Sequence, residues 1–174
     1  YNLDRDGLRL FHDERFRHLA RSNADLLACE TIPSAEEAQV LVELIQASDK
    51  WAWLSFSCRD DGHLSDGTPI EAVVEAVQAT PGLAALGVNC TAPRFITALI
   101  QRIRSRTDLP VIVYPNSSEI YDARSKLWTE GPADAGWEDG PTQWMRAGAQ
   151  IIGGCCRIEP DTVRRLRELL PSPT

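Results

Sequence analysis

Short apolar runs alternate with amphipathic stretches along most of the chain. The apolar runs predict five strands, which lie at residues 25–30, 51–57, 83–90, 109–115 and 150–156. Apolar residues spaced three and four apart predict helices, which cover 8–22, 93–104 and the stretches after Ser34, after Thr68 and from Pro160. Strands that alternate with helices in this way are typical of βα units around a parallel sheet. The pattern therefore predicts an α/β fold.

Two of the helix starts carry a capping-box signature. Ser34 precedes Glu37 by three residues, and Thr68 precedes Glu71 by three. In such a box the hydroxyl of the first residue accepts a hydrogen bond from a backbone N–H of the first turn. Pro69 also suits a first helical position, because its missing N–H has no partner to lose there. We therefore expect Ser34 and Thr68 to be N-caps.

The connection from residue 116 to residue 141 has neither helical nor strand periodicity. Connections of this length in a compact domain are usually binding loops, lids or disordered segments. This one holds Tyr121, Trp128 and Trp137, and aromatic residues disfavour simple disorder. The segment is therefore expected to be a loop that covers a substrate.

Polar and reactive residues stand where the predicted strands end. These residues are Glu30, Ser57, Cys90, Asn116 and the Cys155–Cys156 pair. In a (β/α)₈ TIM barrel the carboxyl ends of the strands converge on one mouth, where catalytic residues lie. Five units are too few to close such a barrel, which takes roughly 250 residues. The chain also lacks the glycine-rich motifs of nucleotide-binding sheets.

Composition and charge exclude several classes of function. The 174 residues suit a single domain over 1–174, and 18 basic against 25 acidic residues give a net charge of −7. That balance argues against nucleic-acid or anionic-membrane partners. No apolar run approaches the roughly 18 residues that cross a bilayer. The chain begins with neither Met nor a signal peptide, which leaves open a fragment or a processed protein.

The chain has five cysteines, an odd number, and two of them are adjacent. Adjacent cysteines rarely form a disulfide with each other, because the bond geometry strains the intervening peptide. A reducing cytoplasm therefore fits the sequence better than an oxidising compartment. Cys29 and Cys58 are expected to pack as small apolar residues.

Cys90, Cys155 and Cys156 end two different predicted strands, so they could meet at one barrel mouth. Three thiolates make a soft ligand set that suits Zn²⁺, and an open fourth position is typical of a catalytic zinc. Neighbouring residues on a regular strand point to opposite faces, so both cysteines can bind one ion only if the backbone departs from the strand. Gly153 and Gly154 permit that departure. The alternative from spacing alone is that all three cysteines are buried in the core.

Five segments resemble the homocysteine S-methyltransferase family, and they stand in the family's order. They are ADLLACETIP at 24–33, LSDGTP at 64–69, LGVNC at 86–90, VYPNS at 113–117 and IIGGCCR at 151–157. The branch that uses S-methylmethionine or S-adenosylmethionine is the most similar. The resemblance implies a (β/α)₈ barrel of which this chain supplies about the last five βα units, the N-terminal strands being absent. It also implies zinc held by Cys90, Cys155 and Cys156, with homocysteine sulfur as the fourth ligand.

The resemblance implies roles for further residues. Glu30 corresponds to an acidic residue near the homocysteine amino group, and Tyr114 and Asn116 belong to a substrate-binding motif. For Asn116, a role in holding the loop is the equal alternative. Trp128 and Trp137 are candidates for contact with a sulfonium methyl donor, because aromatic faces attract cations; loop packing is the alternative.

The resulting hypothesis is zinc-dependent transfer of a methyl group from a sulfonium donor to homocysteine thiolate, which forms methionine. One alternative is a related thiol or selenol methyltransferase with another donor, such as betaine. The other is a non-catalytic zinc-binding partial barrel or interaction module. A partial barrel has unpaired strand edges, which the missing N-terminal half or another subunit would cover.

Overall fold

The computed structural model describes residues 3–122, 124–129 and 136–169. Its main sheet is parallel, and its strand order is β1-β2-β3-β4-β7. The strands are β1 (Leu26–Ile32), β2 (Trp51–Phe56), β3 (Leu83–Asn89), β4 (Val111–Tyr114) and β7 (Ala149–Ile152). All five predicted strands are therefore confirmed, although the last one ends at Ile152 rather than at Cys156.

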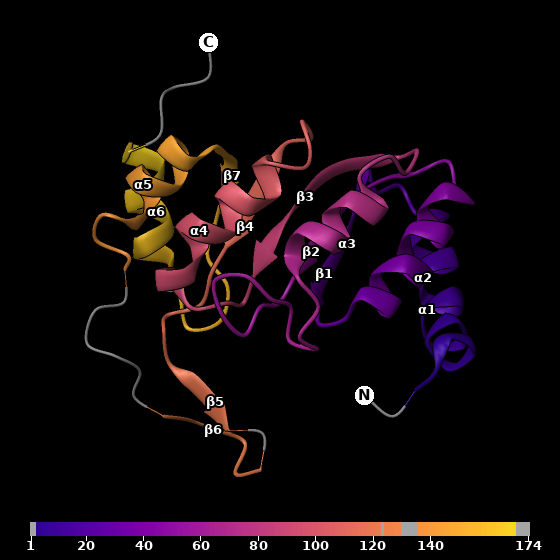
Figure 1. The fold of residues 1–174 in the computed structure, drawn as a ribbon, viewed down its shortest axis with the longest axis horizontal. Helices are drawn as coiled ribbons and strands as arrows, with labels where there is room; N and C mark the ends of the chain where they lie inside the picture. Colours follow the sequence, from indigo (N-terminus) through magenta and orange to yellow (C-terminus); the bar gives the residue numbers. More distant parts are fainter. Residues whose placement is uncertain (1–2, 123, 130–135, 170–174) are drawn as a thin grey trace.

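The helices follow one another along one face of this sheet (Figure 1). They are α1 (Arg5–Ala20), α2 (Ala35–Gln46), α3 (Ile70–Val77), α4 (Pro93–Arg104), α5 (Gly140–Ala147) and α6 (Pro160–Leu169). Each helix contacts the next one along the chain, so the six form a single layer. Within the described residues, no helix has the length and apolar character needed to span a membrane.

The core lies between the helices and the sheet. Leu54, Leu86, Val88 and Val113 alternate along their strands toward the helices, and all four are fully buried. The opposite face of the sheet, here called the inner face, carries none of the helices in the described ranges. Large apolar side chains on the main sheet stay exposed there, namely Leu26 by 39%, Trp51 by 58% and Ile151 by 46%.

The two helix starts differ from each other. The Ser34 hydroxyl accepts a hydrogen bond from the Glu37 backbone N–H at 3.2 Å, so this predicted N-cap is confirmed. The Thr68 prediction is wrong, because α3 begins one residue later than expected and has no side-chain cap. The Thr68 hydroxyl donates to Asp66 instead, at 3.0 Å.

A buried contact joins α1 to α2 through His12 and Glu37. His12 is buried, and its Nε2 lies 2.7 Å from Oε1 of Glu37. The Glu37 side chain therefore joins α2 to α1 instead of completing a capping box at its own helix.

The connection after β4 is more regular than its sequence suggests. It contains an antiparallel hairpin of β5 (Ile120–Asp122) and β6 (Leu127–Thr129), in which Tyr121 and Trp128 stand opposite each other. Their rings are 5.2 Å apart. The hairpin projects away from the sheet and the helices (Figure 1). The expectation of a loop without strands is therefore wrong here, and residues 123 and 130–135 lie outside the described part.

Candidate metal centre

Three sulfur atoms meet at the carboxyl ends of β3 and β7. The Sγ atoms of Cys90, Cys155 and Cys156 all lie within 4.8 Å of one another. Cys90 and Cys156 are 3.6 Å apart, and Cys155 and Cys156 are 4.0 Å apart. A Zn–S bond of about 2.3 Å in a tetrahedral site places two sulfurs about 3.8 Å apart. The spacing of the three thiols therefore fits one ion of that size.

The backbone explains how two adjacent cysteines reach one point. Because β7 ends at Ile152, residues 153–156 are free of the strand's alternation. The turn is fixed by hydrogen bonds to the neighbouring loop: Cys155 N–H donates to Pro115 O at 2.9 Å, and Ser117 N–H donates to Cys156 O at 3.2 Å.

Cys90 is presented by an unusual backbone conformation. It directly follows β3 and has a φ of 48°, which few residues other than glycine adopt. Its backbone N–H donates to Tyr114 O at 3.1 Å, so the residue remains anchored to the end of β4. The thiol is thereby turned toward the Cys155–Cys156 turn.

Cys90 and Cys155 shift each other's pKa in opposite directions. A hydrogen bond with Cys90 lowers the pKa of Cys155 to about 6, and the same contact raises the pKa of Cys90. Three thiolates at this spacing repel one another unless a cation neutralises them. By contrast, burial raises the pKa of Cys29 and Cys58 to about 12, so these two remain thiols away from the cluster.

Glu30 and Tyr114 lie beside the cluster on the inner face. They line a cavity of about 220 Å³ together with Trp53, Gly153 and Gly154. Burial raises the pKa of the Tyr114 hydroxyl, against the opposing effect of hydrogen bonds to Ser55 and Trp53. This cavity offers a carboxylate and a hydroxyl close to the loop that carries Cys155.

The Asn116 side chain forms hydrogen bonds with loop residues and does not line this cavity. Its Nδ2 donates to Cys90 O at 3.4 Å, and its Oδ1 accepts from the Ser118 backbone N–H at 3.0 Å. Ser118 has a φ of 77°, a left-handed conformation. These contacts support the loop-holding alternative for Asn116.

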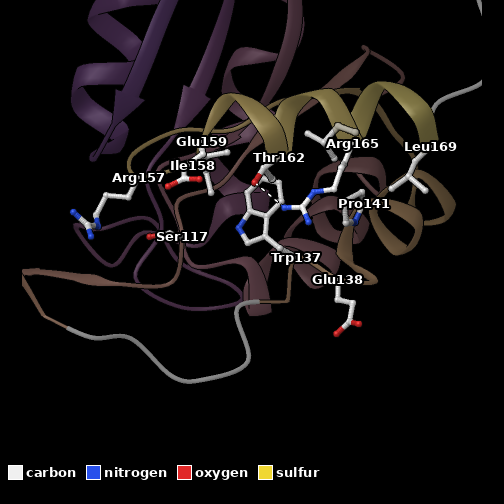
Figure 2. Close-up of a pocket in the computed structure, with 11 residues that line it drawn as sticks. Ser117, Trp137, Glu138, Pro141, Arg157, Ile158, Glu159, Thr162, Arg165 and Leu169 are labelled. Atoms are coloured by element: carbon white, nitrogen blue, oxygen red, sulfur yellow. Dashed lines mark hydrogen bonds between the residues drawn. The ribbon is translucent and has the colours of Figure 1, made fainter.

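A second, larger cavity of about 650 Å³ lies between the end of the long connection and α6 (Figure 2). Trp137 lines its centre, and its Nε1 donates to Asn116 O at 2.8 Å. The Trp137 ring also meets Trp144 edge to face, with centroids 5.2 Å apart. Trp137 is thus packed beside the loop that Asn116 holds, whereas Trp128 lies on the hairpin.

Arg157, which directly follows Cys156 in the sequence, also lines this cavity. It forms an ion pair with Glu119, and the Glu119 carboxylate also accepts from Ser117 Oγ at 2.6 Å. The ion pair lowers the pKa of Glu119. The loops after β4 and β7 are therefore joined by side chains as well as by backbone hydrogen bonds.

Sequence reasoning missed the polar side chains behind the cluster, namely Thr31, Ser55, Asn89 and Thr91. Asn89 directly precedes Cys90 and is buried. The sequence contained a signal for this network. Asn89 is a polar residue at the end of an apolar strand, and a buried polar side chain requires hydrogen-bond partners.

Comparison with protein families matches residues 1–170 to the family described as homocysteine S-methyltransferase. Homocysteine S-methyltransferase from Escherichia coli strain K12 is 44% identical over 169 residues, which are 96% of this chain and 54% of that protein. Homocysteine S-methyltransferase YbgG from Bacillus subtilis strain 168 is 39% identical over 167 residues, which are 95% of this chain and 53% of that protein.

A solved structure gives the same result. The metallated form of the homocysteine methyltransferase MmuM from Escherichia coli matches with a TM-score of 0.82 and 39% identity, over 98% of this chain and 54% of that one. The chain therefore spans about half the length of the relatives it matches.

Proposed function

The chain belongs to the homocysteine S-methyltransferase family, and on that basis we propose that it forms the metal-bearing part of a homocysteine S-methyltransferase. The observation that carries the proposal is the cluster of three sulfurs within 4.8 Å. Cys90, Cys155 and Cys156 would hold Zn²⁺, which thiolates favour. The existence of a metallated form of MmuM supports a metal in this family, and the choice of zinc rests on the ligand set.

Homocysteine is the proposed acceptor. Bound zinc would supply the thiolate form of its sulfur at neutral pH. Glu30 would pair with the ammonium group of homocysteine, because a carboxylate–ammonium hydrogen bond is short and orienting. Tyr114 lines the same cavity and would hold the substrate beside Glu30. These residues would direct the sulfur toward the cysteine cluster.

The proposed donor is a sulfonium compound such as S-methylmethionine or S-adenosylmethionine. The homocysteine sulfur attacks the methyl carbon, and a new C–S bond forms. The bond from that carbon to the donor sulfur breaks, and its electron pair stays on the donor, which leaves as a neutral thioether. Methionine is the other product. Alignment of donor and acceptor is the protein's main contribution to such a step.

We further propose that residues 1–174 are the C-terminal part of a single (β/α)₈ barrel. Among the described residues, β1 pairs only with β2, and β7 pairs only with β4. The exposed apolar side chains of Leu26, Trp51 and Ile151 on the inner face support burial against further strands. The remaining βα units, in the same protein or in another subunit, would cover both edges. The reduced cysteines support a cytoplasmic location.

Metal analysis and activity test this proposal together. Purified chain should retain about one zinc per molecule, and Cys156→Ser should lose it. Cys58→Ser is the matched control, because Cys58 lies outside the cluster and should leave the zinc content unchanged. Methionine formation from homocysteine and S-methylmethionine should then appear when the N-terminal βα units of the Escherichia coli relative are supplied. A folded chain that never holds zinc would contradict the proposal.

One observation favours a second candidate, a non-catalytic zinc-binding partial barrel. The chain spans about half of each relative, so a catalytic group could be lacking. Zinc binding without methyl transfer, even with the N-terminal units present, would support this candidate instead.

A further inference from the structure

Asn89 stands at the centre of a polar network on the inner face. It is the last residue of β3, and only 1% of its surface is exposed. Its neighbours come from β1, β2 and the loop after β7. Each of these segments also carries a residue of the candidate site or lies next to one.

The side-chain amide of Asn89 uses all of its hydrogen-bonding capacity. Oδ1 accepts from the Thr31 backbone N–H at 2.8 Å and from Ser55 Oγ at 2.9 Å. Nδ2 donates to Thr31 Oγ1 at 2.7 Å and lies 3.9 Å from Cys155 Sγ. A backbone N–H can only donate, so the Thr31 contact fixes which end of the amide is oxygen. The Nδ2 group therefore faces the sulfur.

Thr31, directly after Glu30 on β1, is another member of the network. Its φ is 60°, which is an outlier for a β-branched residue, and the pairing of β1 with β2 shifts register between Cys29 and Ile32. Asn89 holds both the backbone and the hydroxyl of Thr31. It thereby stabilises the irregular stretch of β1 that directly follows Glu30.

Tyr114 extends the network across the sheet. Its hydroxyl lies 2.6 Å from Ser55 Oγ, and it accepts from Trp53 Nε1 at 3.0 Å. Ser55 in turn donates to Asn89. Two of the side chains that line the cavity beside the cluster, Trp53 and Tyr114, are thus connected to Asn89 through the buried Ser55 hydroxyl.

We propose that Asn89 is a positioning residue that orients the Cys155 sulfur for metal binding and fixes the irregular stretch of β1 after Glu30. One side chain would then help to position both Cys155 and Glu30, which stand at the two ends of the proposed substrate site. This inference rests on the proposed function, because it requires that the cysteine cluster bind a metal. Hydrogen bonds from residues behind the ligands orient metal sites, and their loss typically weakens metal affinity about 10- to 100-fold.

Two substitutions at Asn89 test this role by metal binding alone. Asn89→Ala removes the whole amide. Asn89→Asp keeps the acceptor oxygen Oδ1 and replaces the Nδ2 group, with its two N–H donors, by a second acceptor oxygen. Each should weaken zinc affinity about 10- to 100-fold in a chelator competition. Each should also alter the thiolate-to-metal absorption of the Co²⁺-loaded chain. The matched control is Asn23→Asp, the same chemical change at an exposed position, which should alter neither readout.

Ser55→Ala distinguishes orientation of the Cys155 sulfur by Asn89 from a general effect of the network on stability. This change removes one donor to Oδ1 and leaves Nδ2 in place, so zinc affinity should remain close to that of the unaltered chain. An equal loss in Ser55→Ala and Asn89→Asp would overturn the inference, because it would mean that the network acts only through stability.

A measurement on the unaltered chain covers the case in which the Asn89 variants do not fold. The side-chain ¹⁵N–¹H₂ resonances of Asn89 should move when Zn²⁺ is added, and those of Asn23 should not. An unmoved Asn89 resonance in a chain that binds zinc refutes the inference alone. A chain that binds no zinc refutes the proposed function, and the inference with it.

Discussion

Gly87 on β3 lies so close to Ile112 on β4 that no side chain fits between them. A Cβ atom added to Gly87 would stand 1.6 Å from the Ile112 carbonyl oxygen. The two residues are register partners in the sheet, two positions before Asn89 and Tyr114. The close approach of β3 and β4 at this point therefore depends on glycine.

Gly87→Ala should consequently destabilise the chain. The methyl group would meet backbone rather than a movable side chain, and we expect a loss of about 3 kcal/mol in the free energy of unfolding. Urea denaturation measures this loss. The matched control is Gly62→Ala, whose added Cβ would meet only the Arg102 side chain at 3.4 Å. Similar stability of the two variants would contradict the expectation.

Glu37→Ala should also lower stability, because it leaves the buried Nε2 of His12 without its hydrogen-bond partner. A buried polar group that loses its hydrogen bond costs about 1–3 kcal/mol. The midpoint of urea unfolding should therefore fall for Glu37→Ala. Glu36→Ala, one residue earlier and exposed, should stay within about 0.5 kcal/mol of the unaltered chain. Equal midpoints for the two variants would show that the pair adds nothing.

Asp60 should make stability depend on pH in the acid range. Hydrogen bonds from the Gly62 backbone N–H and from His63 lower the pKa of Asp60 to about 2. A carboxylate whose pKa is lower in the folded state than its unfolded value of about 3.9 contributes stability above that value. The contribution is lost as pH falls from about 4 to about 2.

The variant Asp60→Asn isolates this effect. We expect the unaltered chain to be the more stable of the two at pH 7, and the difference between them to shrink by pH 3. Urea midpoints at both pH values give the comparison. A difference that stays constant with pH would rule out ionisation of Asp60 as its source.

The two tryptophans of the long connection should respond differently to substitution. Trp137 is fixed by Asn116 and Trp144, so Trp137→Ala should cost about 2 kcal/mol. Trp128 contributes one cross-strand aromatic pair on the hairpin, so Trp128→Ala should cost only about 0.5 kcal/mol. Thermal unfolding measures both changes. The reverse order of stability would contradict the assignment of Trp137 to packing.

The fold was largely predictable because its elements are long and strongly patterned. Each of the five strands is mostly apolar, because the side chains that face the helices are buried. The likeness to MmuM identifies this sheet and its outer layer of helices as a partial TIM barrel, as expected. The hairpin was missed because its strands have only three residues each and show no alternation long enough to read.

The meeting of the three cysteines was predictable, and the polar network behind them was not. Cys90, Cys155 and Cys156 do meet, because strand ends converge. The contact of Asn89 with Thr31 spans 58 positions in the sequence and depends on a left-handed residue, and neither fact has a local signature. The contacts of His12 and Thr68 were not predictable for a similar reason. His12 contacts Glu37 on another helix, and Thr68 donates to Asp66 in the preceding loop.

In the described part of the chain, β1 and β7 are the two edge strands of the main sheet, at opposite ends of its strand order. A polypeptide that completes the ring must join both edges at once, since pairing with one alone leaves the other exposed. Assembly from two pieces should therefore be all-or-none and should depend on the concentration of each piece. Mixing this chain with a separately produced N-terminal half, and measuring complex formation as the concentration of each piece is varied, would test this expectation.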